Sequence, residues 1–228
     1  MLRSVLSYCI IALSVMLISG ISYGWVSEDI GTTDVGSTEQ VGSSFTLTAG
    51  GADIWGNTDG FRMVYEEVSG DFEISAQLVS LENTNSWAKA GVMARGSNAP
   101  DSWFAWSFVT VGNGTSFQWR TTDGDRCWPD GGGIAGVAPY YVKLVREGND
   151  FFGYRSEDGV AWEENNTSGQ PNTVTIEDIS DPILVGLAHT SHSAGNIGTS
   201  EFTHVITPTA VNPKGKVAVT WAGIKESH

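Results

Sequence analysis

The sequence is short of cysteine, and this shortage limits how the fold can be stabilised. Two cysteines occur among the 228 residues, Cys9 and Cys127. Cys9 lies in an apolar leader, so the expected mature chain has one cysteine and no intrachain disulfide. Such a chain must rely on a large hydrophobic core rather than on cross-links. The sequence leaves two interpretations of Cys127 open, a buried small hydrophobic residue or a free thiol near the surface.

Basic residues are also scarce. The chain has 12 Lys and Arg against 26 Asp and Glu, a formal net charge of -14, which becomes about −15 when Arg3 leaves with the leader. Nucleic acids bind through phosphates that attract Lys and Arg, so this balance excludes a nucleic-acid partner. It also argues against binding to an anionic membrane surface. Neutral ligands, cations and other proteins remain compatible with the composition.

The familiar hydrolytic motifs are absent from the sequence. A β-sandwich glucanase of the E-x-D-x-x-E type places two carboxylates about 5–5.5 Å apart on one strand face, and no such motif occurs. The neighbours Glu66 and Glu67 would face opposite sides of a strand. There is no G-x-S-x-G motif. His189 and His192 are expected to point in opposite directions, with His192 capping a turn. A hydrolase site built across several strands is therefore the least favoured alternative.

No sequence spacing indicates a zinc site or a resident cofactor. The segment 123–133 is acidic and rich in glycine, and calcium prefers several oxygen ligands in a flexible loop. The spacing of the EF-hand loop is missing, however. A solvated loop is the favoured interpretation, and a calcium site is the alternative.

The first 24 residues have the composition of a secretory signal peptide. Met1-Leu2-Arg3 is a short basic start, the run from Ser4 to Ile18 carries no charge, and small residues lie at Ser22 and Gly24. An uncleaved anchor is the alternative, although the run is near the lower length limit for a membrane span. We therefore expect a secreted or cell-surface protein that is not inserted in a membrane after cleavage. Removing 24 residues from 228 leaves 204, enough for one domain.

Helical periodicity is missing from the rest of the chain. Short runs of β-forming residues recur instead, separated by Gly, Asn, Asp and Ser. This pattern predicts an all-β fold, a two-sheet antiparallel jelly-roll sandwich. The expected strands cover residues 44–49, 62–68, 71–80, 87–95, 102–111, 115–122, 139–147, 150–156, 160–163, 172–177, 182–190 and 198–206, with one short strand at most in 25–43 and a last one over 216–223.

The clearest local signal is a hairpin within 139–163. Residues 140–146 alternate between bulky or apolar and polar side chains, and a Gly/Asn/Asp turn cluster follows at 147–150. The return strand covers 151–156, and a second turn at Asp158-Gly159 precedes a third run at 160–162. Alternating runs joined by such turns are typical of β-hairpins.

Alternation also predicts which side chains face outward. Phe104, Trp106 and Phe108 form the bulkier face of their strand and are expected inside, which places Trp103 outside. If the strands are neighbours, their outer faces form an open polar surface. That surface would carry Glu73, Gln77, Lys89, Arg95, Gln118 and Arg120. A further expectation is that Arg95 pairs with Glu73.

The D-I-W-G-x-x-D-G segment predicts a structural corner. Asp53 and Asp59 bracket Trp55, and Asp side chains commonly accept hydrogen bonds from nearby backbone amides. We therefore expect both carboxylates to accept hydrogen bonds from backbone amides of the turn, and Trp55 to lie in the core.

Several segments in order resemble a known family. They are G-A-D-I-W-G-x-x-D-G-F, S-G-D-F-E-I, W-A-K-A-G-V-M-A-R, the hairpin segment, and V-G-L-A-H-T-S-H-S-A-G. Together they resemble the concanavalin A-like/LamG-like β-sandwich modules of secreted bacterial proteins, some of which are appended to glycoside hydrolases. The resemblance covers about residues 25–206. It implies a jelly-roll of two curved sheets and, more loosely, a lectin-like role. Residues 207–228 are expected to form a C-terminal extension with one added strand.

Aromatic side chains are the best candidates for contact with a ligand. Sugar rings stack on Trp, while their hydroxyls need polar partners such as Arg and Gln. The sequence therefore predicts a ligand-binding patch of Trp103, Trp128, Arg95, Gln118 and Arg120. The expected function is a secreted, lectin-like, non-catalytic carbohydrate-binding module whose partner is a polysaccharide or glycan. A structural or adhesion module of the cell surface is the alternative, and a glycoside hydrolase is less favoured. The sequence leaves the oligomeric state open.

Overall fold

The computed structural model describes residues 24–167, 169–212 and 216–217, and these residues form strands and loops without a helix. Within them no helix is long and apolar enough to cross a bilayer. The predicted signal peptide lies almost wholly outside the described residues, as does most of the strand expected at 216–223. The limits of the domain therefore stay predictions.

Sixteen strands make up the described chain. In order they are β1 Val26–Gly31, β2 Ser37–Val41, β3 Ser44–Ala49, β4 Ile54–Trp55, β5 Thr58–Val68, β6 Phe72–Leu81, β7 Lys89–Arg95, β8 Phe104–Thr110, β9 Thr115–Arg120, β10 Tyr140–Glu147, β11 Asp150–Ser156, β12 Glu163–Glu164, β13 Thr173–Thr175, β14 Ile183–Thr190, β15 Gly198–Asn212 and β16 Lys216–Val217.

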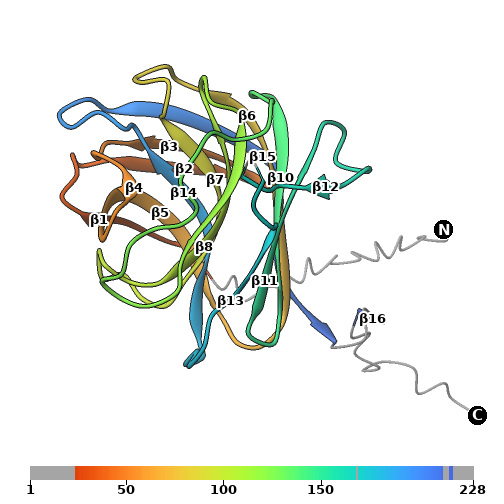
Figure 1. Cartoon of the computed structure of the whole chain (residues 1–228). Coiled ribbons are helices and arrows are strands. Elements are labelled where there is room, and N and C mark those ends of the chain that lie inside the picture. The colour runs from red at the N-terminus through yellow and green to blue at the C-terminus, as the bar shows by residue number, and fades with distance from the viewer. Residues whose placement is uncertain (1–23, 168, 213–215, 218–228) are drawn as a thin grey trace, which may run out of the picture.

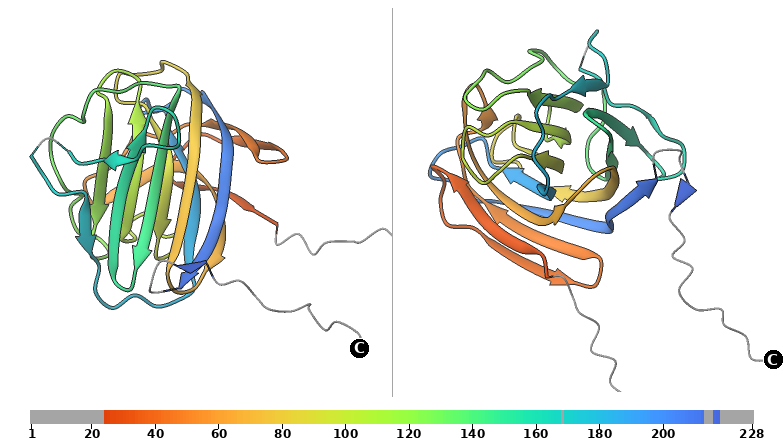
Figure 2. Two further views of the ribbon diagram at one scale, coloured as in Figure 1. Left: turned by 90° about the vertical axis from the view of Figure 1, so that its right-hand side faces the viewer. Right: turned by 90° about the horizontal axis from the view of Figure 1, so that it is seen from below.

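The strands form two antiparallel sheets that pack as a sandwich (Figure 1). One, called here the β5 sheet, has the order β1-β5-β14-β7-β8-β9, with β4 paired to β5. The other, the β6 sheet, has the order β12-β11-β10-β6-β15-β3-β2, with β13 paired to β11. Figure 2 shows β11, β10, β6 and β15 side by side across the second sheet. The prediction of an all-β fold in which two antiparallel sheets pack as a sandwich is confirmed.

The main core lies between the two sheets. Alternate residues of each strand supply it, as period-2 side-chain geometry requires. On β10, Val142 and Leu144 are completely buried, and Phe72 and Ile74 of the neighbouring β6 lie beside them. Burying such side chains stabilises the fold by about 25 cal/mol per Å² of apolar area removed from water. The sandwich can therefore form without a disulfide.

A second hydrophobic cluster covers the outer face of the β5 sheet. Phe104, Trp106 and Phe108 of β8 belong to it, together with Ile54 of the short strand β4 and Cys127 of the loop after β9. The expectation that these three aromatic residues are buried is correct, but they face away from the inter-sheet core. Because loops cover this face, β7, β8 and β14 are buried along their whole length. The predicted open polar surface is therefore wrong for these strands.

Most predicted strands are found, and the β10–β11 hairpin is confirmed, with Glu147 opposite Asp150. Its third strand lies at Glu163–Glu164 rather than at 160–162. The region 25–43 holds two strands, β1 and β2, where one at most was expected. β15 continues through Asn212, into the segment expected to lie beyond the sandwich.

Candidate functional site

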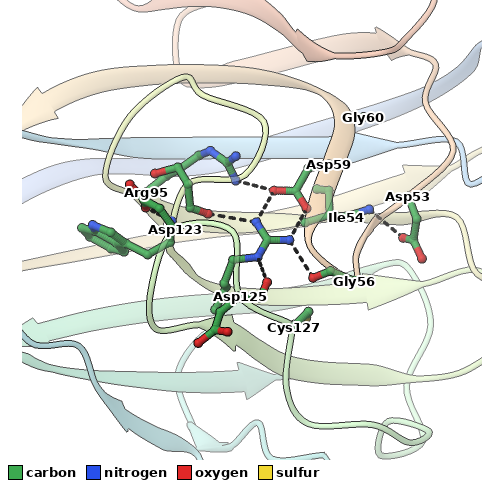
Figure 3. Close-up of polar contacts among 12 residues, drawn as sticks. Asp53, Ile54, Gly56, Asp59, Gly60, Arg95, Asp123, Asp125 and Cys127 are labelled. Atoms are coloured by element: carbon green, nitrogen blue, oxygen red, sulfur yellow. Dashed lines mark hydrogen bonds and ion pairs between the residues drawn. The ribbon is translucent and has the colours of Figure 1, made fainter.

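The two arginines of the predicted ligand patch belong to a buried ion network on the outer face of the β5 sheet. Arg95 and Arg120 have no exposed surface, and they flank Phe104 in the row that joins β7, β8 and β9. The Asp59 carboxylate contacts both guanidinium groups: its Oδ2 lies 2.7 Å from Arg95 Nη1, and its Oδ1 lies 2.8 Å from Arg120 Nη2. Figure 3 shows Asp59 and Arg95 pointing toward each other. The expectation that these arginines lie on an open surface is wrong.

The remaining guanidinium donors tie loops to the sheet. Arg120 Nε donates to Asp125 O (2.8 Å), and Arg120 Nη2 donates to Gly56 O (3.0 Å). Arg95 Nε donates to Ser97 O at 2.9 Å. Arg95 does not pair with Glu73, which lies on β6 in the other sheet and is 3.6 Å from Lys143 Nζ. Burial lowers the pKa of Arg95, and the Asp59 carboxylate opposes that change. The network therefore fixes the turn after Trp55 and the loop after β9.

Those two loops and the turn after β14 surround a cleft of about 390 Å³. Its lining residues are Asp53, Trp55, Trp87, Lys89, Gln118, Gly131, Gly132 and His192. The volume is within the range of small-molecule sites, about 300–1,000 Å³. Trp55 and Trp87 are partly exposed, so each presents part of an indole to solvent. Trp55 was expected in the core, but it packs only at the edge of the second cluster.

Lys89 supplies the cation of this cleft. Its side chain is only 2% exposed, and Nζ donates to Asp53 Oδ1 at 2.7 Å. The same ammonium lies 5.6 Å from the ring centroid of Trp55 and 6.0 Å from that of Trp87. Ring faces at such distances attract a cation through their quadrupoles. Lys89 is thus held both by an ion pair and by the aromatic walls.

His192 completes a chain of polar contacts with Asp53. It follows β14 in a turn with φ of 52°, and its Nε2 lies 3.0 Å from Asp53 Oδ2. Burial alone would raise the pKa of Asp53, but the hydrogen bond from His192 and the charge of Lys89 outweigh it and lower that pKa. Asp53 is therefore an ionised acceptor. Its Oδ1 also accepts from the Ile54 amide at 2.7 Å, in line with the predicted turn role.

Gln118 is the one residue of the predicted patch that lines the cleft. It lies opposite Trp106 in the β8–β9 register and is 2% exposed. Its Nε2 donates to Pro129 O at 3.4 Å, whereas its Oε1 has no hydrogen-bond partner among the described residues. A buried polar atom without a partner costs about 1–3 kcal/mol, so native structures rarely leave one without a reason.

The two tryptophans of the predicted patch lie elsewhere. Trp103 packs against Phe151 of the inter-sheet core, with ring centroids 5.9 Å apart, and lines a separate cleft at the far end of β7. Its indole crosses Gly96 so closely that a Cβ there would be 2.3 Å from Nε1. Trp128 is half exposed on its loop, under the Arg126 guanidinium. The five residues therefore do not form one surface, and their binding role stays a prediction.

Sequence reasoning missed Asp53, Trp55, Trp87 and His192 as possible ligand contacts. Asp53, Trp87 and His192 lie in loops next to strands. Alternation predicts where side chains point only within a strand, so it does not apply to these three. The pairing of Asp53 with both Lys89 and His192 joins residues 36 and 139 positions apart in the chain. A signal was nevertheless present, because Trp87 and Lys89 are two positions apart and therefore share one face of an extended strand.

The acidic loop after β9 makes contacts with protein groups. Asp123 Oδ1 accepts from the Trp103 amide at 2.7 Å, and Asp130 pairs with Arg126. In the part of the chain that the structure describes, no group of three or more His, Cys, Asp and Glu side chains is arranged to hold a metal ion.

Cys127 lies in the second hydrophobic cluster and is buried. Burial raises the pKa of its thiol to about 12, so roughly one molecule in ten thousand carries a thiolate at pH 8. We expect the thiol to resist a maleimide in the folded protein and to react within minutes in denaturant. Mass spectrometry of the two samples measures this, and rapid labelling of the folded protein would contradict the buried position.

The chain is an all-β sandwich of two antiparallel sheets, with loops covering the outer face of the β5 sheet. No family model and no curated protein matches the sequence. Among solved structures, a functionally unknown protein from Saccharomyces cerevisiae matches with TM-score 0.54 and 16% identity over 82% of this chain and 96% of that one. The GH43 BlXynB protein from Bacillus licheniformis matches with TM-score 0.51 and 15% identity, over 70% of this chain and 31% of that one.

A legume lectin-like domain from Entamoeba histolytica also matches, with TM-score 0.45 and 12% identity over 82% of this chain and 90% of that one. The likeness to the yeast and GH43 proteins, at 16% and 15% identity, shows a shared fold and nothing about activity. The chain spans less than a third of the GH43 protein. The function therefore has to be argued from the cleft itself.

Proposed function

We propose that the protein binds carbohydrate in the cleft between Trp55 and Trp87. The observation that carries the proposal is the pairing of two partly exposed indoles with a buried polar atom, Gln118 Oε1, that lacks a partner among the described residues. Sugars need both features, an aromatic face for their C–H groups and polar atoms for their hydroxyls.

The larger cleft beside Trp103 supports binding less well. Its volume is about 580 Å³, but its only aromatic lining residue is Trp103. Most of its polar side chains, such as Thr121, Asp123 and Glu177, are exposed to water. Hydroxyl and carboxylate groups already in water gain little from a ligand, because each new hydrogen bond replaces one to solvent.

The composition of the Trp55–Trp87 cleft supports binding rather than hydrolysis. Glycoside hydrolysis generally requires two carboxyl groups that flank the scissile bond. Asp53 is the single carboxylate among the described residues that line this cleft, and it is occupied by Lys89 and His192. We therefore propose a lectin-like module without its own hydrolytic site.

Replacing the cleft tryptophans tests this proposal. We expect Trp55→Ala and Trp87→Ala to weaken binding at least about tenfold, roughly 1.4 kcal/mol, because each removes an aromatic face. A glycan array identifies ligands, and isothermal titration calorimetry then compares the variants, with circular dichroism confirming that each is folded.

Trp128→Ala is the matched control, because Trp128 is half exposed outside the cleft. It should bind as the unaltered protein does. Loss of binding in Trp128→Ala or Trp103→Ala, with normal binding in the cleft variants, would place the site at that tryptophan and overturn the cleft assignment.

We also propose that the protein works outside the cytoplasm after removal of residues 1–24. The uncharged run from Ser4 to Ile18 and the small residues before Trp25 support this. Sequencing the N-terminus of protein recovered from the periplasm or medium should give Trp25 as the first residue. Recovery of the intact leader in the cytosol would contradict it.

A further inference from the structure

The charged groups of the cleft already pair with one another, and this pairing limits which sugars the cleft can bind. Lys89 is paired with Asp53, whose lowered pKa keeps it ionised. An acidic sugar would therefore meet no free cation at Lys89 and would approach the Asp53 carboxylate. Displacing Asp53 from this largely buried pair would leave a charge without its partner, which is costly in a low-dielectric site. The cleft offers no charge that favours a uronate or a sulfated sugar.

A cationic ligand is disfavoured for a different reason. The aromatic faces that would attract it already surround an ammonium, because Lys89 Nζ lies within 6.0 Å of the ring centroids of Trp55, Trp87 and Phe108. The ammonium of an amino sugar would enter beside a like charge. A neutral ring meets neither penalty and can pack its C–H groups against the exposed parts of the indoles.

Two atoms of the cleft residues are acceptors that lack a hydrogen-bond partner among the described residues, and we call them the open acceptors. One is Gln118 Oε1, since the amide nitrogen of that side chain faces Pro129 O. The other is His192 Nδ1. Asp53 accepts from Nε2, so in the neutral imidazole the proton is on Nε2 and Nδ1 carries a lone pair. Both open acceptors require a donor.

We infer that the cleft takes a neutral sugar ring with at least two hydroxyl groups that donate to Gln118 Oε1 and His192 Nδ1. This inference rests on the proposed function and specifies its ligand class. Hydroxyl groups can donate to both atoms without bringing a charge, whereas a carboxylate has no donor to offer. A site built to bond ligand hydroxyls rejects analogues that lack them, because its own polar atoms then stay unpaired. Gln118 and His192 are thus the specificity-determining residues.

Matched sugars test the ligand class. Neutral oligosaccharides are compared by calorimetry with the uronic-acid and amino-sugar oligosaccharides of the same linkage and length, using the purified protein. We expect neutral chains to bind at least tenfold more tightly than either charged counterpart. Equal or tighter binding of a charged chain would overturn the inference and leave the proposed carbohydrate binding intact. Failure of every sugar to bind would overturn both.

Substituting Gln118 tests the first open acceptor. Gln118→Met keeps the length of the side chain and removes the oxygen. We expect at least a tenfold loss of affinity for the neutral sugar with little change in melting temperature, because removing the unpaired Oε1 offsets the loss of the 3.4 Å hydrogen bond from Nε2 to Pro129 O. Gln77→Met is the matched control on the β6 sheet, where Gln77 accepts from Thr203. Unaltered affinity in a folded Gln118→Met protein would overturn the role of Gln118.

The imidazole of His192 can be followed in the unaltered protein, which avoids any doubt about folding. Nitrogen-15 NMR distinguishes the protonated Nε2 from the bare Nδ1. Adding the neutral sugar should shift the Nδ1 resonance towards that of a hydrogen-bonded nitrogen and leave Nε2 protonated. A saturating titration that leaves Nδ1 unmoved would overturn its role as acceptor.

Discussion

Asp59→Asn is expected to destabilise the fold by about 3–5 kcal/mol, because it leaves two buried guanidinium groups without their shared counter-ion. Asp59, Arg95 and Arg120 have completely buried side chains, and three hydrogen bonds of 2.7–2.9 Å connect them. Asn keeps the shape of the side chain but loses its charge and one acceptor oxygen. Urea unfolding followed by tryptophan fluorescence measures the change in the free energy of unfolding.

Asp130→Asn is the control for this prediction. Its pair with Arg126 is about half exposed, and such surface pairs contribute about 0–1 kcal/mol. If Asp59→Asn cost no more than Asp130→Asn, the buried network would not hold the loops in place. Because Arg120 also binds Gly56 O and Asp125 O, we further expect the folded Asp59→Asn protein to lose carbohydrate affinity through a displaced Trp55 wall.

Acid is expected to destabilise the protein through His189, by about 3 kcal/mol between pH 7 and pH 4. His189 is completely buried, and burial lowers its pKa from 6.5 to about 4. A lowered folded-state pKa means that the unfolded chain binds the proton first. The stability due to neutral His189 is therefore present above pH 6.5, is lost as the pH falls from 6.5 to about 4, and is fully lost below that.

His189→Gln isolates this contribution from the carboxylates that titrate in the same range. Urea midpoints at pH 7, 6, 5 and 4 give the free energy of unfolding for both proteins, and the difference in their pH slopes reports His189. The variant should lose about 3 kcal/mol less than the unaltered protein over this range. Parallel slopes would show that His189 does not stay neutral in the fold.

The strand pattern could be predicted from sequence because β-strands alternate with a period that is local. The runs at 140–147 and 150–156 showed that alternation and enclose a Gly/Asn turn, and the structure pairs them as a hairpin. β1 and β2 were harder to find. They are rich in polar residues because only Ile30 among them is buried, so their apolar signal is weak.

The outer face of the β5 sheet was wrongly predicted to be open to solvent, because its burial depends on residues far away in the sequence. Alternation separates Arg95 and Arg120 from the inter-sheet core, but it does not tell whether the outer face meets water or a loop. Asp59 lies 36 and 61 positions away from them in sequence, and its carboxylate is what makes their burial tolerable. No local rule connects these three residues.

The candidate cleft depended on the same kind of information. Gln118 was predicted as a ligand contact from its residue type and neighbours, and it does line the cleft. Trp55 ends the short strand β4, whereas Trp87 and His192 lie in separate loops. The three residues meet only because the sheet brings β5, β7 and β14 together. The sequence by itself determined an acidic, cysteine-poor, all-β sandwich, since composition and side-chain alternation are local properties. Only the tertiary structure decided which charges are buried and where a ligand can enter, because both depend on loops that fold over a sheet from distant parts of the chain.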